Sequence, residues 1–329
     1  MVGQKFIELL LDHPWFEIAA LAASERSVGK PYKEATIWRM KTPIPKEIAE
    51  MPVVGCDVKL PSRVAFSGLT SQAAKIVEKD LLDRGVVVIS NAGSYRMDPA
   101  VPLLIPEINS DHLQLVDGKT GMIVTNPNCS VIGIAMALKP LIDHWGIDDV
   151  QVVTLQALSG AGYPGVASLD IIDNVIPFIS NEEDKVETEP QKIFGEYKNG
   201  KIDPYPMRIS AQCTRVPVAD GHTACISVKL KKKARHEEII EAWESFRGRP
   251  QELDLPLAPK QPIHYFSEPS YPQPKLHRNL EGGMAVSIGR LRPCPLNDWK
   301  FVLLSHNTVR GAAGGAILNA ELMVKEGRI

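Results

Sequence analysis

The residues Met122-Ile-Val-Thr-Asn-Pro-Asn-Cys-Ser-Val-Ile-Gly-Ile-Ala-Met-Ala-Leu138 carry the clearest structural signal in this chain. The part up to Asn128 predicts a buried strand that ends in turn residues, and the part from Ser130 opens a largely apolar helix that runs to about Trp145. Cys129 therefore lies where a strand meets a helix, beside unpaired backbone N–H groups and the positive end of the helix dipole. Such a position favours the thiolate, the nucleophilic form of cysteine. The alternative is a small buried core residue.

The composition is that of an ordinary soluble globular protein, with 44% apolar and 23% charged residues in a chain of 329. This length predicts two domains. The net charge of −2 gives no support to a nucleic acid or an anionic membrane as a partner. One basic run, Lys229-Leu-Lys-Lys-Lys233 followed by Arg235, ends an expected strand and is interpreted as a solvated strand end.

The five cysteines are scattered and odd in number, and no pair has the close spacing of a zinc site or a redox motif. The eight histidines are equally dispersed. We therefore expect a reducing cytoplasm and no bound metal. The longest apolar run, Val131 to Leu138, is far shorter than the roughly 20 residues that span a bilayer. The amino terminus lacks a basic region followed by an apolar stretch, so no secretory signal is predicted.

The first third of the chain alternates helices with strands. Helices are predicted at 4–11 and 70–84, and buried strands at 16–23, 63–66, 85–89 and 122–125. Near-continuous apolar strands separated by helices indicate a parallel sheet covered on both faces, which is a doubly wound α/β domain.

From Asp149 onward the strands become longer and alternate more clearly between apolar and polar residues. Strands are predicted at 150–158, 223–231, 284–292 and 299–305, with a helix at 235–246. This pattern predicts a second, α+β domain. Residues 250–274 are rich in proline and are expected to form an extended loop or arm. The tail, 307–325, is helical again and is expected to return to the first domain.

The beginning of the chain departs from the usual order of a nucleotide-binding unit. Such a unit starts with a strand and a glycine-rich turn, and the phosphates bind at the N-terminus of the helix that follows. Here the chain begins in the helix, and Gly3 looks like the last glycine of that turn. Either the sequence starts late or the protein lacks a central strand.

Arg215 and His222 lie on one short segment, Thr214-Arg-Val-Pro-Val-Ala-Asp-Gly-His222, just before an expected strand. An arginine offers a bidentate fork for a carboxylate, and a histidine can exchange protons near neutral pH. A cysteine nucleophile with a histidine base is a common arrangement for acyl chemistry. A surface salt bridge for Arg215 and a structural imidazole for His222 are the alternatives.

Four motifs in this order resemble one known family. They are Asn126-Pro-Asn-Cys-Ser130, Gln156-Ala-Leu-Ser-Gly-Ala-Gly-Tyr-Pro-Gly165, Arg215 with His222, and Asn307-Thr-Val-Arg-Gly-Ala-Ala-Gly314. Together they closely resemble the aspartate-semialdehyde dehydrogenases of the archaeal and fungal branch, over essentially the whole chain from Gly3. The resemblance implies a Rossmann-type NADP domain and a second domain for catalysis and dimerisation. We expect residues 1–128 with 307–329 to form the first, and residues 129–306 the second.

The resemblance implies a reaction in the biosynthesis of lysine, threonine and methionine. Cys129 would attack the acyl phosphate of 4-phospho-L-aspartate and form a thioester, which NADPH reduces to the semialdehyde while phosphate is released. His222 would be the general acid and base. Gln156 would orient the substrate, Arg215 would hold its α-carboxylate, and Asn128 would help to polarise the acyl oxygen.

Three further residues match substrate contacts of the family. Glu182 matches its acidic substrate contact, with Lys185 near the phosphate, and Arg96 matches the other phosphate-binding position. Simple electrostatics agrees, because an acyl phosphate carries two or more negative charges that Arg96 and Lys185 would balance. A solvated helix turn, with Glu182 and Lys185 paired at i,i+3, is the alternative.

The residues that follow the expected strand 16–23 indicate the cofactor. An NAD enzyme usually places an acidic residue on the ribose hydroxyl at this point, whereas Ser24, Arg26 and Ser27 suit the 2′-phosphate of NADP. Glu25 weakens this interpretation, because it would also suit the ribose. By resemblance, further cofactor positions are Gly3, Ser67, Ser159, Gly160, Asn307 and Gly311.

The family normally opens with a strand and a Gly-Ala-Thr-Gly-Met-Val-Gly turn, and Met1 resembles the methionine inside that turn. We therefore expect a start codon assigned too far downstream, or a fragment, and a chain that is less stable and binds NADP more weakly than a version extended upstream.

Two other enzyme classes and one non-enzyme class remain open at this point. Malonyl-CoA reductase is a close relative with the same cysteine chemistry, and N-acetyl-glutamyl-phosphate reductase is a more distant one. A non-catalytic remnant with a crippled cofactor site is the third possibility. The family is generally dimeric or tetrameric, so a homodimer or homotetramer is expected.

Overall fold

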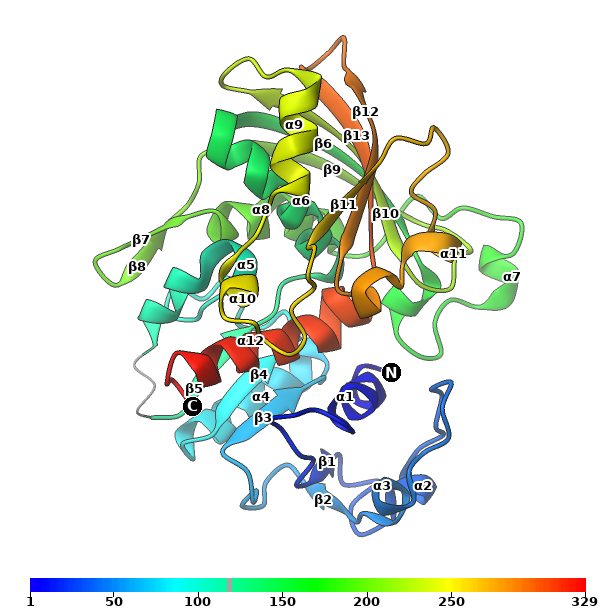
Figure 1. Ribbon diagram of the computed structural model, residues 1–329. Helices are drawn as coiled ribbons and strands as arrows, with labels where there is room; N and C mark the ends of the chain where they lie inside the picture. Colours follow the sequence, from blue (N-terminus) through cyan, green and yellow to red (C-terminus); the bar gives the residue numbers. More distant parts are fainter. Residues whose placement is uncertain (117–119) are drawn as a thin grey trace.

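The structure is a computed structural model that describes residues 1–116 and 120–329 (Figure 1). In the view of Figure 1, the lower part contains two small parallel sheets formed by β1 to β5 (residues 21–125). The upper part contains one large mixed sheet. The helix that begins with Cys129, α6 (Cys129–Trp145), extends from the lower part into the core under the large sheet.

The lower part contains the parallel sheet that the apolar pattern predicts. Strands β3 (Val64–Ser67), β4 (Val87–Ser90) and β5 (Met122–Thr125) pair in parallel in the order β3-β4-β5. Every residue of β4 and β5 is buried, which explains their uninterrupted apolar sequence. Helix α4 (Ser71–Asp83) connects β3 to β4, and the side chain of Thr70 caps its N-terminus.

The prediction of a strand over 16–23 is correct only for its last residues. Strand β1 (Leu21–Ala23) pairs in parallel with β2 (Val53–Gly55), which the sequence did not reveal, and these two form a separate sheet. Residues 16–20 belong to no strand, and among the described residues β1 and β3 each pair with one strand only. A mainly apolar pocket of about 260 Å³ lies between β1, β3 and the amphipathic helix α1 (Val2–Leu10). The expectation of a strand upstream of the chain stays a prediction.

The large sheet has six strands in the order β11-β12-β13-β10-β6-β9. Their bounds are β6 (Ile147–Gln156), β9 (Arg208–Arg215), β10 (His222–Leu230), β11 (Ile263–Phe266), β12 (Val286–Pro293) and β13 (Trp299–Ser305). The pairs β11–β12 and β6–β9 are parallel and the other three are antiparallel, so the second domain is α+β with a mixed sheet.

Two expectations about this sheet are corrected. Strand β9 was not predicted, although it ends at Arg215. The proline-rich segment is more than an arm, because its residues Ile263–Phe266 form the edge strand β11 in parallel with β12. Residues at a sheet edge need only one backbone partner, so a short strand can form without a long apolar pattern.

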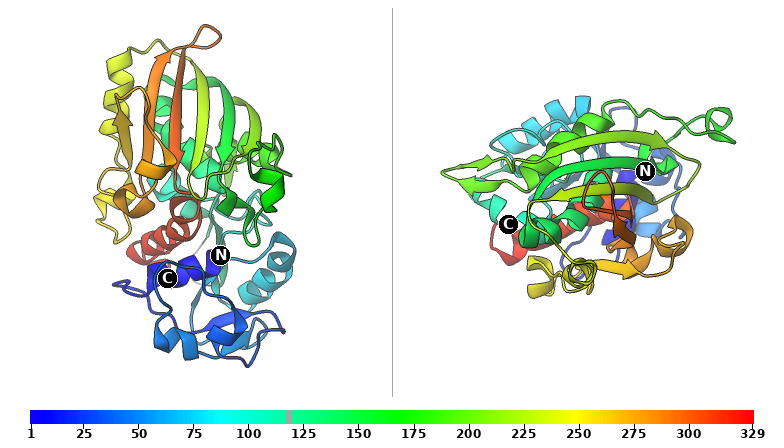
Figure 2. Two further views of the ribbon diagram at one scale, coloured as in Figure 1. Left: turned by 90° about the vertical axis from the view of Figure 1, so that its right-hand side faces the viewer. Right: turned by 90° about the horizontal axis from the view of Figure 1, so that it is seen from above.

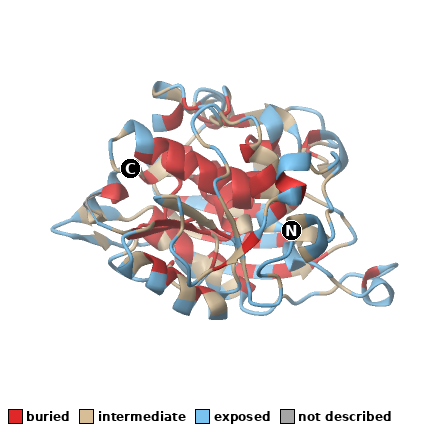
Figure 3. Ribbon diagram, turned by 90° about the horizontal axis from the view of Figure 1, so that it is seen from below, coloured by how far each residue is buried: buried red, intermediate tan, exposed pale blue. Residues whose placement is uncertain are grey.

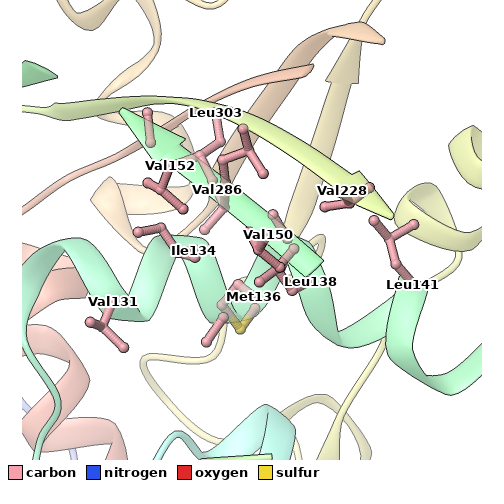
Figure 4. Close-up of a cluster of buried hydrophobic side chains, with 14 of the residues drawn as sticks. Val131, Ile134, Met136, Leu138, Leu141, Val150, Val152, Val228, Val286 and Leu303 are labelled. Carbon is pink, nitrogen blue, oxygen red and sulfur yellow. The ribbon is translucent and has the colours of Figure 1, made fainter. Parts of the chain in front are cut away.

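One face of the large sheet is covered by α6, α8 (Glu182–Ile193) and α9 (His236–Glu244). Apolar side chains of α6 interlock there with those of β6, β10, β12 and β13 (Figure 4). The other face carries no described helix, and the left panel of Figure 2 looks onto it. Val153 and Cys225 are exposed there.

The carboxyl-terminal helix α12 (Gly314–Lys325) returns to the lower part, as predicted. It follows a π-helical turn, η4 (Val309–Ala313), and packs against β4. Gly314 to Met323 are all buried, and Figure 3 shows this helix from below. Its apolar residues share one cluster with α1, β4 and β5.

The remaining elements are short. They are α2 (Tyr32–Ala35), α3 (Lys46–Glu50), α5 (Pro106–Asn109), α7 (Ser168–Ile171), α10 (Arg249–Glu252), α11 (Pro274–His277), the hairpin β7 (Glu196–Lys198) with β8 (Lys201–Asp203), and the 3-10 turns η1 (Ser110–Leu115), η2 (Leu158–Ala161) and η3 (Leu280–Gly283). In the described part of the chain, no helix combines the length and the apolar character that a membrane crossing requires.

Candidate active site

Cys129 lies at the junction of a strand and a helix, as predicted, and is itself the first residue of α6, one residue earlier than expected. The side chain of Asn128 caps this helix, because its Oδ1 accepts hydrogen bonds from the backbone N–H groups of Ser130 (2.9 Å) and Val131 (3.2 Å). The cap fixes the position of the cysteine relative to the helix axis. The sulfur lies 3.2 Å from Nε2 of His222, so the structure brings the two expected catalytic residues into direct contact.

His222 opens strand β10 and is only 3% exposed. The backbone N–H of Ala157 donates to its Nδ1 at 3.0 Å, which turns the Nε2 edge of the ring toward the sulfur. A neutral ring that accepts at Nδ1 carries its proton on Nε2, facing Cys129. Burial, followed by the positive charges of Arg215 and His306, lowers the pKa of His222 to about 3. The ring is therefore neutral throughout the physiological range.

The expectation that Cys129 is a thiolate at rest is wrong. Cys129 is partly exposed to the cavity, but the protein atoms packed around it desolvate the sulfur, and this desolvation, with the negative charge of Glu182, raises the pKa of Cys129 to about 12. Arg96, Arg215 and Lys185 act in the opposite direction but more weakly. The effect of the helix N-terminus, at most about 2 kcal/mol in a partly buried site, does not outweigh the loss of hydration. The resting site thus holds a thiol beside a neutral imidazole.

This protonation state predicts how fast iodoacetamide alkylates Cys129 in the free protein. Only the thiolate reacts, and below a pKa of about 12 its fraction rises by about tenfold for each pH unit. The alkylation rate at Cys129 is therefore expected to rise steeply from pH 7 to pH 10. Peptide mass spectrometry measures this rate separately from alkylation of the exposed Cys225. A rate that levels off below pH 8 would show a thiolate and contradict this assignment.

Five of the six expected substrate residues line one cavity of about 330 Å³, and the sixth, Arg215, is not part of its wall. Arg96, Asn128, Gln156, Glu182 and Lys185 line it together with Cys129. They come from four different places in the chain: the loop after β4, the start of α6, the end of β6 and the start of α8. Only the tertiary fold joins them.

Glu182 is the centre of the hydrogen bonds in this cavity and is 5% exposed. Its Oε1 accepts from Nδ2 of Asn128 (2.8 Å) and Nε2 of Gln156 (3.1 Å). Its Oε2 accepts from Nζ of Lys185 at 3.2 Å. The i,i+3 ion pair between Glu182 and Lys185 thus exists, but it lies in the wall of the cavity and is not a solvated helix turn.

Arg215 and His222 lie directly behind Gly160. A Cβ atom on Gly160 would come within 2.8 Å of Nη1 of Arg215 and 2.9 Å of the His222 ring. Nη1 of Arg215 donates to the carbonyl of Ala157 at 2.7 Å. A side chain at position 160 would therefore displace the groups that face the sulfur.

Four of the expected cofactor residues also line the cavity: Ser159, Gly160, Asn307 and Gly311. Asn307 connects two loops, because its Nδ2 donates to Oγ of Ser159 and its Oδ1 accepts from the N–H of Gly221, both at 2.8 Å. Gly311 contacts the nucleophile itself, and a Cβ there would lie 2.8 to 3.0 Å from atoms of Cys129.

The other expected cofactor residues lie outside this cavity. Gly3 lines the apolar pocket beside β1, and Ser67 is buried at the end of β3. Ser24 and Arg26 are exposed, and Ser27 is half-buried, in the turn that follows β1. They occupy the carboxyl end of a parallel strand, the edge where doubly wound folds bind nucleotides.

Several residues of the cavity wall were not among the predicted site residues, although Gly162, Thr308 and Ala312 lie inside the quoted motifs. The unpredicted residues are Met1, Val2, Leu69, Thr70, Ser71, Asn91, Ala92, Gly93, Gly162, Thr308 and Ala312. Residues 69–71 and 91–93 directly follow β3 and β4, so the rule that ligands bind beyond the carboxyl ends of parallel strands would have found them. A buried acid, Glu189, was also missed. It lies seven residues after Glu182, which is two turns along the same helix face.

Two family models and several curated proteins match this chain. Residues 1–116 match the family model "Semialdehyde dehydrogenase, NAD binding domain", and residues 138–310 match "Semialdehyde dehydrogenase, dimerisation domain". The aspartate-semialdehyde dehydrogenase of Archaeoglobus fulgidus is 48% identical over 99% of this chain and 96% of that protein. That of Schizosaccharomyces pombe is 49% identical with the same two coverages.

The solved structures agree as well. The Candida albicans aspartate semialdehyde dehydrogenase with NADP superposes with a TM-score of 0.93 at 40% identity, over 100% of this chain and 96% of that one. Aspartate semialdehyde dehydrogenase II of Vibrio cholerae gives 0.77 at 26% identity, over 99% and 96%. The chain belongs to the aspartate-semialdehyde dehydrogenase family.

Proposed function

We propose that this protein catalyses the NADPH-dependent reductive dephosphorylation of 4-phospho-L-aspartate to L-aspartate 4-semialdehyde, through a thioester on Cys129. The observation that carries the proposal is the 3.2 Å contact between the sulfur of Cys129 and Nε2 of His222. This pair lies beside a cavity whose wall contains one acid and two cations suited to an amino-acid phosphate: Glu182, Arg96 and Lys185.

The charges around the cavity match those of the substrate one by one. Glu182 suits the α-ammonium group, and Arg215 suits the α-carboxylate because its planar fork binds a carboxylate with two hydrogen bonds. Arg96 and Lys185 suit the phosphate group. Gln156, which already donates to Glu182, is positioned to orient the amino-acid end.

The first chemical step joins the sulfur to the acyl carbon and breaks the bond from that carbon to the phosphate oxygen. The thiol proton ends on the released phosphate, so charges and atoms balance. Negative charge grows on the acyl oxygen during the attack, and Asn128, which lines the cavity beside Cys129, is the residue suited to stabilise that charge through its side-chain amide. Because the pKa of Cys129 is raised to about 12, the reaction starts from the thiol and not from a preformed thiolate.

His222 serves as the proton-exchanging group, and its resting geometry favours the acid half of that role. Its Nε2–H faces the sulfur, so it can stabilise the sulfur anion and protonate an oxyanion on the neighbouring carbon. A second proton, on Nδ1, would point at the backbone N–H of Ala157, which now donates to that nitrogen, and the two hydrogens would repel each other. The cationic ring is therefore short-lived in this site.

The residues present fit NADP. When bound, the reduced cofactor supplies the hydride that converts the thioester to the aldehyde level. Ser24, Arg26 and Ser27 would hold its 2′-phosphate. Gly160 and Gly311 line the cavity and let the backbone approach His222 and Cys129 more closely than a Cβ would permit, and Asn307 fixes the loop that contains Ser159. These residues would hold the nicotinamide half.

An assay in the phosphorylating direction tests the proposal. Aspartate semialdehyde, inorganic phosphate and NADP are expected to give NADPH, measured by its absorbance. Malonyl-CoA with NADPH is the comparison, because malonyl-CoA reductase uses the same cysteine chemistry. The α-ammonium and α-carboxylate of aspartate are the groups that Glu182 and Arg215 recognise, so turnover of malonyl-CoA alone would contradict the proposal.

We also propose that residues 1–128 with 307–329 form the NADP domain and 129–306 the catalytic and dimerisation domain. The return of α12 to the β3-β4-β5 sheet supports this division. The matched dimerisation domain supports association of the chain with itself, and a homodimer or homotetramer through the helix-free sheet face is our proposal. Exposed apolar residues support it: Val153 on that face, and Leu169, Ile172, Val175 and Phe178 in the segment whose Ile176 pairs with the edge strand β9. Five free cysteines are consistent with a cytoplasmic location.

A further inference from the structure

Glu189 is a buried carboxylate of α8 that stands behind the cavity and does not line it. It is 2% exposed. Its Oε1 accepts from Nη1 of Arg96 at 2.9 Å, and its Oε2 accepts from the backbone N–H of Asn128 at 2.7 Å. Because Asn128 caps α6, this one carboxylate connects the guanidinium that faces the cavity to the helix that begins with the nucleophile.

Lys192, one turn further along α8, holds the backbone on the other side of Arg96. Its Nζ donates to the carbonyl oxygens of Arg96 (2.7 Å), Asp98 (2.7 Å) and Val101 (2.8 Å). The lysine is 6% exposed. The loop after β4 is thus fixed at its main chain by Lys192 and at its arginine side chain by Glu189.

Arg96 keeps donors for a ligand in spite of these contacts. Nη2 donates to the carbonyl of Asn91 at 2.8 Å. Its Nε is buried and has no hydrogen-bond partner in the described residues, although the residue lines the cavity. Nη1 and Nη2 each carry two N–H groups and each donates one in these contacts, so the guanidinium retains donors for an anion in the cavity.

We propose that Glu189 is a positioning residue that holds Arg96 at a fixed distance from the N-terminus of α6 and so sets the affinity of the site for a phosphate-sized dianion. The inference rests on the proposed function, which makes phosphate the leaving group. Glu189 does not touch the substrate. It acts through Arg96 and Asn128, by preventing the guanidinium from turning away when the cavity is empty.

The first test is the isosteric variant Glu189→Gln. A carboxamide has one acceptor oxygen, so it cannot accept from Arg96 and from Asn128 at the same time. In the phosphorylating direction, KM for inorganic phosphate is expected to rise about tenfold or more, because misplacement of a binding group by about 1 Å costs that much or more. KM for aspartate semialdehyde is expected to change less than about twofold. Asp184→Asn is the control, because it removes the same charge from an exposed position on α8.

A binding measurement separates this inference from the proposed function. Inorganic phosphate is titrated into the protein without other substrates, and its affinity is measured by calorimetry. If the protein does not turn over aspartate semialdehyde but phosphate binds the wild type at least tenfold better than Glu189→Gln, the function fails and the inference stands. If turnover is seen and phosphate binds both proteins equally, the inference is wrong.

A double-mutant cycle tests whether Glu189 acts through Arg96. In an Arg96→Gln background, Glu189→Gln is expected to change phosphate affinity less than about twofold, since its partner is already lost. Independent, additive effects would overturn the proposal. Glu189→Asp and Lys192→Gln are second variants, and both are expected to weaken phosphate binding in the same direction. The proposal is overturned if Glu189→Gln, Glu189→Asp or Lys192→Gln folds and binds phosphate as tightly as the wild type. It is also overturned if none of these three variants folds.

Discussion

Replacement of Cys129 by alanine is expected to reduce kcat by roughly 10⁵-fold or more, the range seen when the nucleophile of a covalent route is removed. The thioester cannot form without the sulfur, and no other described cysteine lines the cavity. The side chain is small and partly exposed to the cavity, so its removal leaves the fold intact. Initial rates with aspartate semialdehyde, phosphate and NADP measure the effect, and thermal melting checks the fold.

Cys225→Ala is the matched control for this variant. Cys225 is exposed on the helix-free face of the large sheet, where it belongs to β10, the strand that His222 opens. Its replacement is expected to leave kcat within about twofold of the wild type. If Cys129→Ala retained more than a few per cent of activity, the covalent mechanism would have to be abandoned.

Replacement of His222 by alanine is expected to lower kcat by about 10²- to 10⁴-fold and to leave a measurable residual reaction. The sulfur remains, and water can enter the space left by the ring and transfer protons less efficiently. Because the pKa of His222 is lowered to about 3, its charge does not change between pH 5 and pH 8 in the free enzyme. The wild-type profile of kcat/KM is therefore expected to show no step near pH 6.5, the usual pKa of histidine.

His236→Ala is the control for a histidine lost far from the cavity, since His236 begins α9 and is partly exposed. Its kcat is expected to stay near that of the wild type. A step near pH 6.5 that disappears in His222→Ala would show that the ring titrates in the ordinary range. That result would mean that burial is much weaker than the structure indicates.

Most regular elements were predictable because their sequence periodicity is local. Strand β5, the turn through Asn128 and the helix α6 follow from an apolar run that ends in turn residues. The three-residue strand β2 and the eight-residue strand β9 were not predicted, since their pairing depends on neighbours that are distant in the chain. The same reason explains β11, which forms because β12 offers a free edge.

The sequence by itself determined the identity of the reacting groups: Cys129 at a strand-to-helix junction, Arg215 and His222 on one segment, and the motifs of the family. The tertiary structure decided their state. Burial and the charge of Glu182 raise the pKa of the thiol, although the local helix N-terminus alone would lower it. It also decided the role of Glu189, an ordinary surface glutamate by sequence that is buried against Arg96 and Asn128. Desolvation and pairing depend on all atoms within a few ångströms, and these come from segments that only folding brings together.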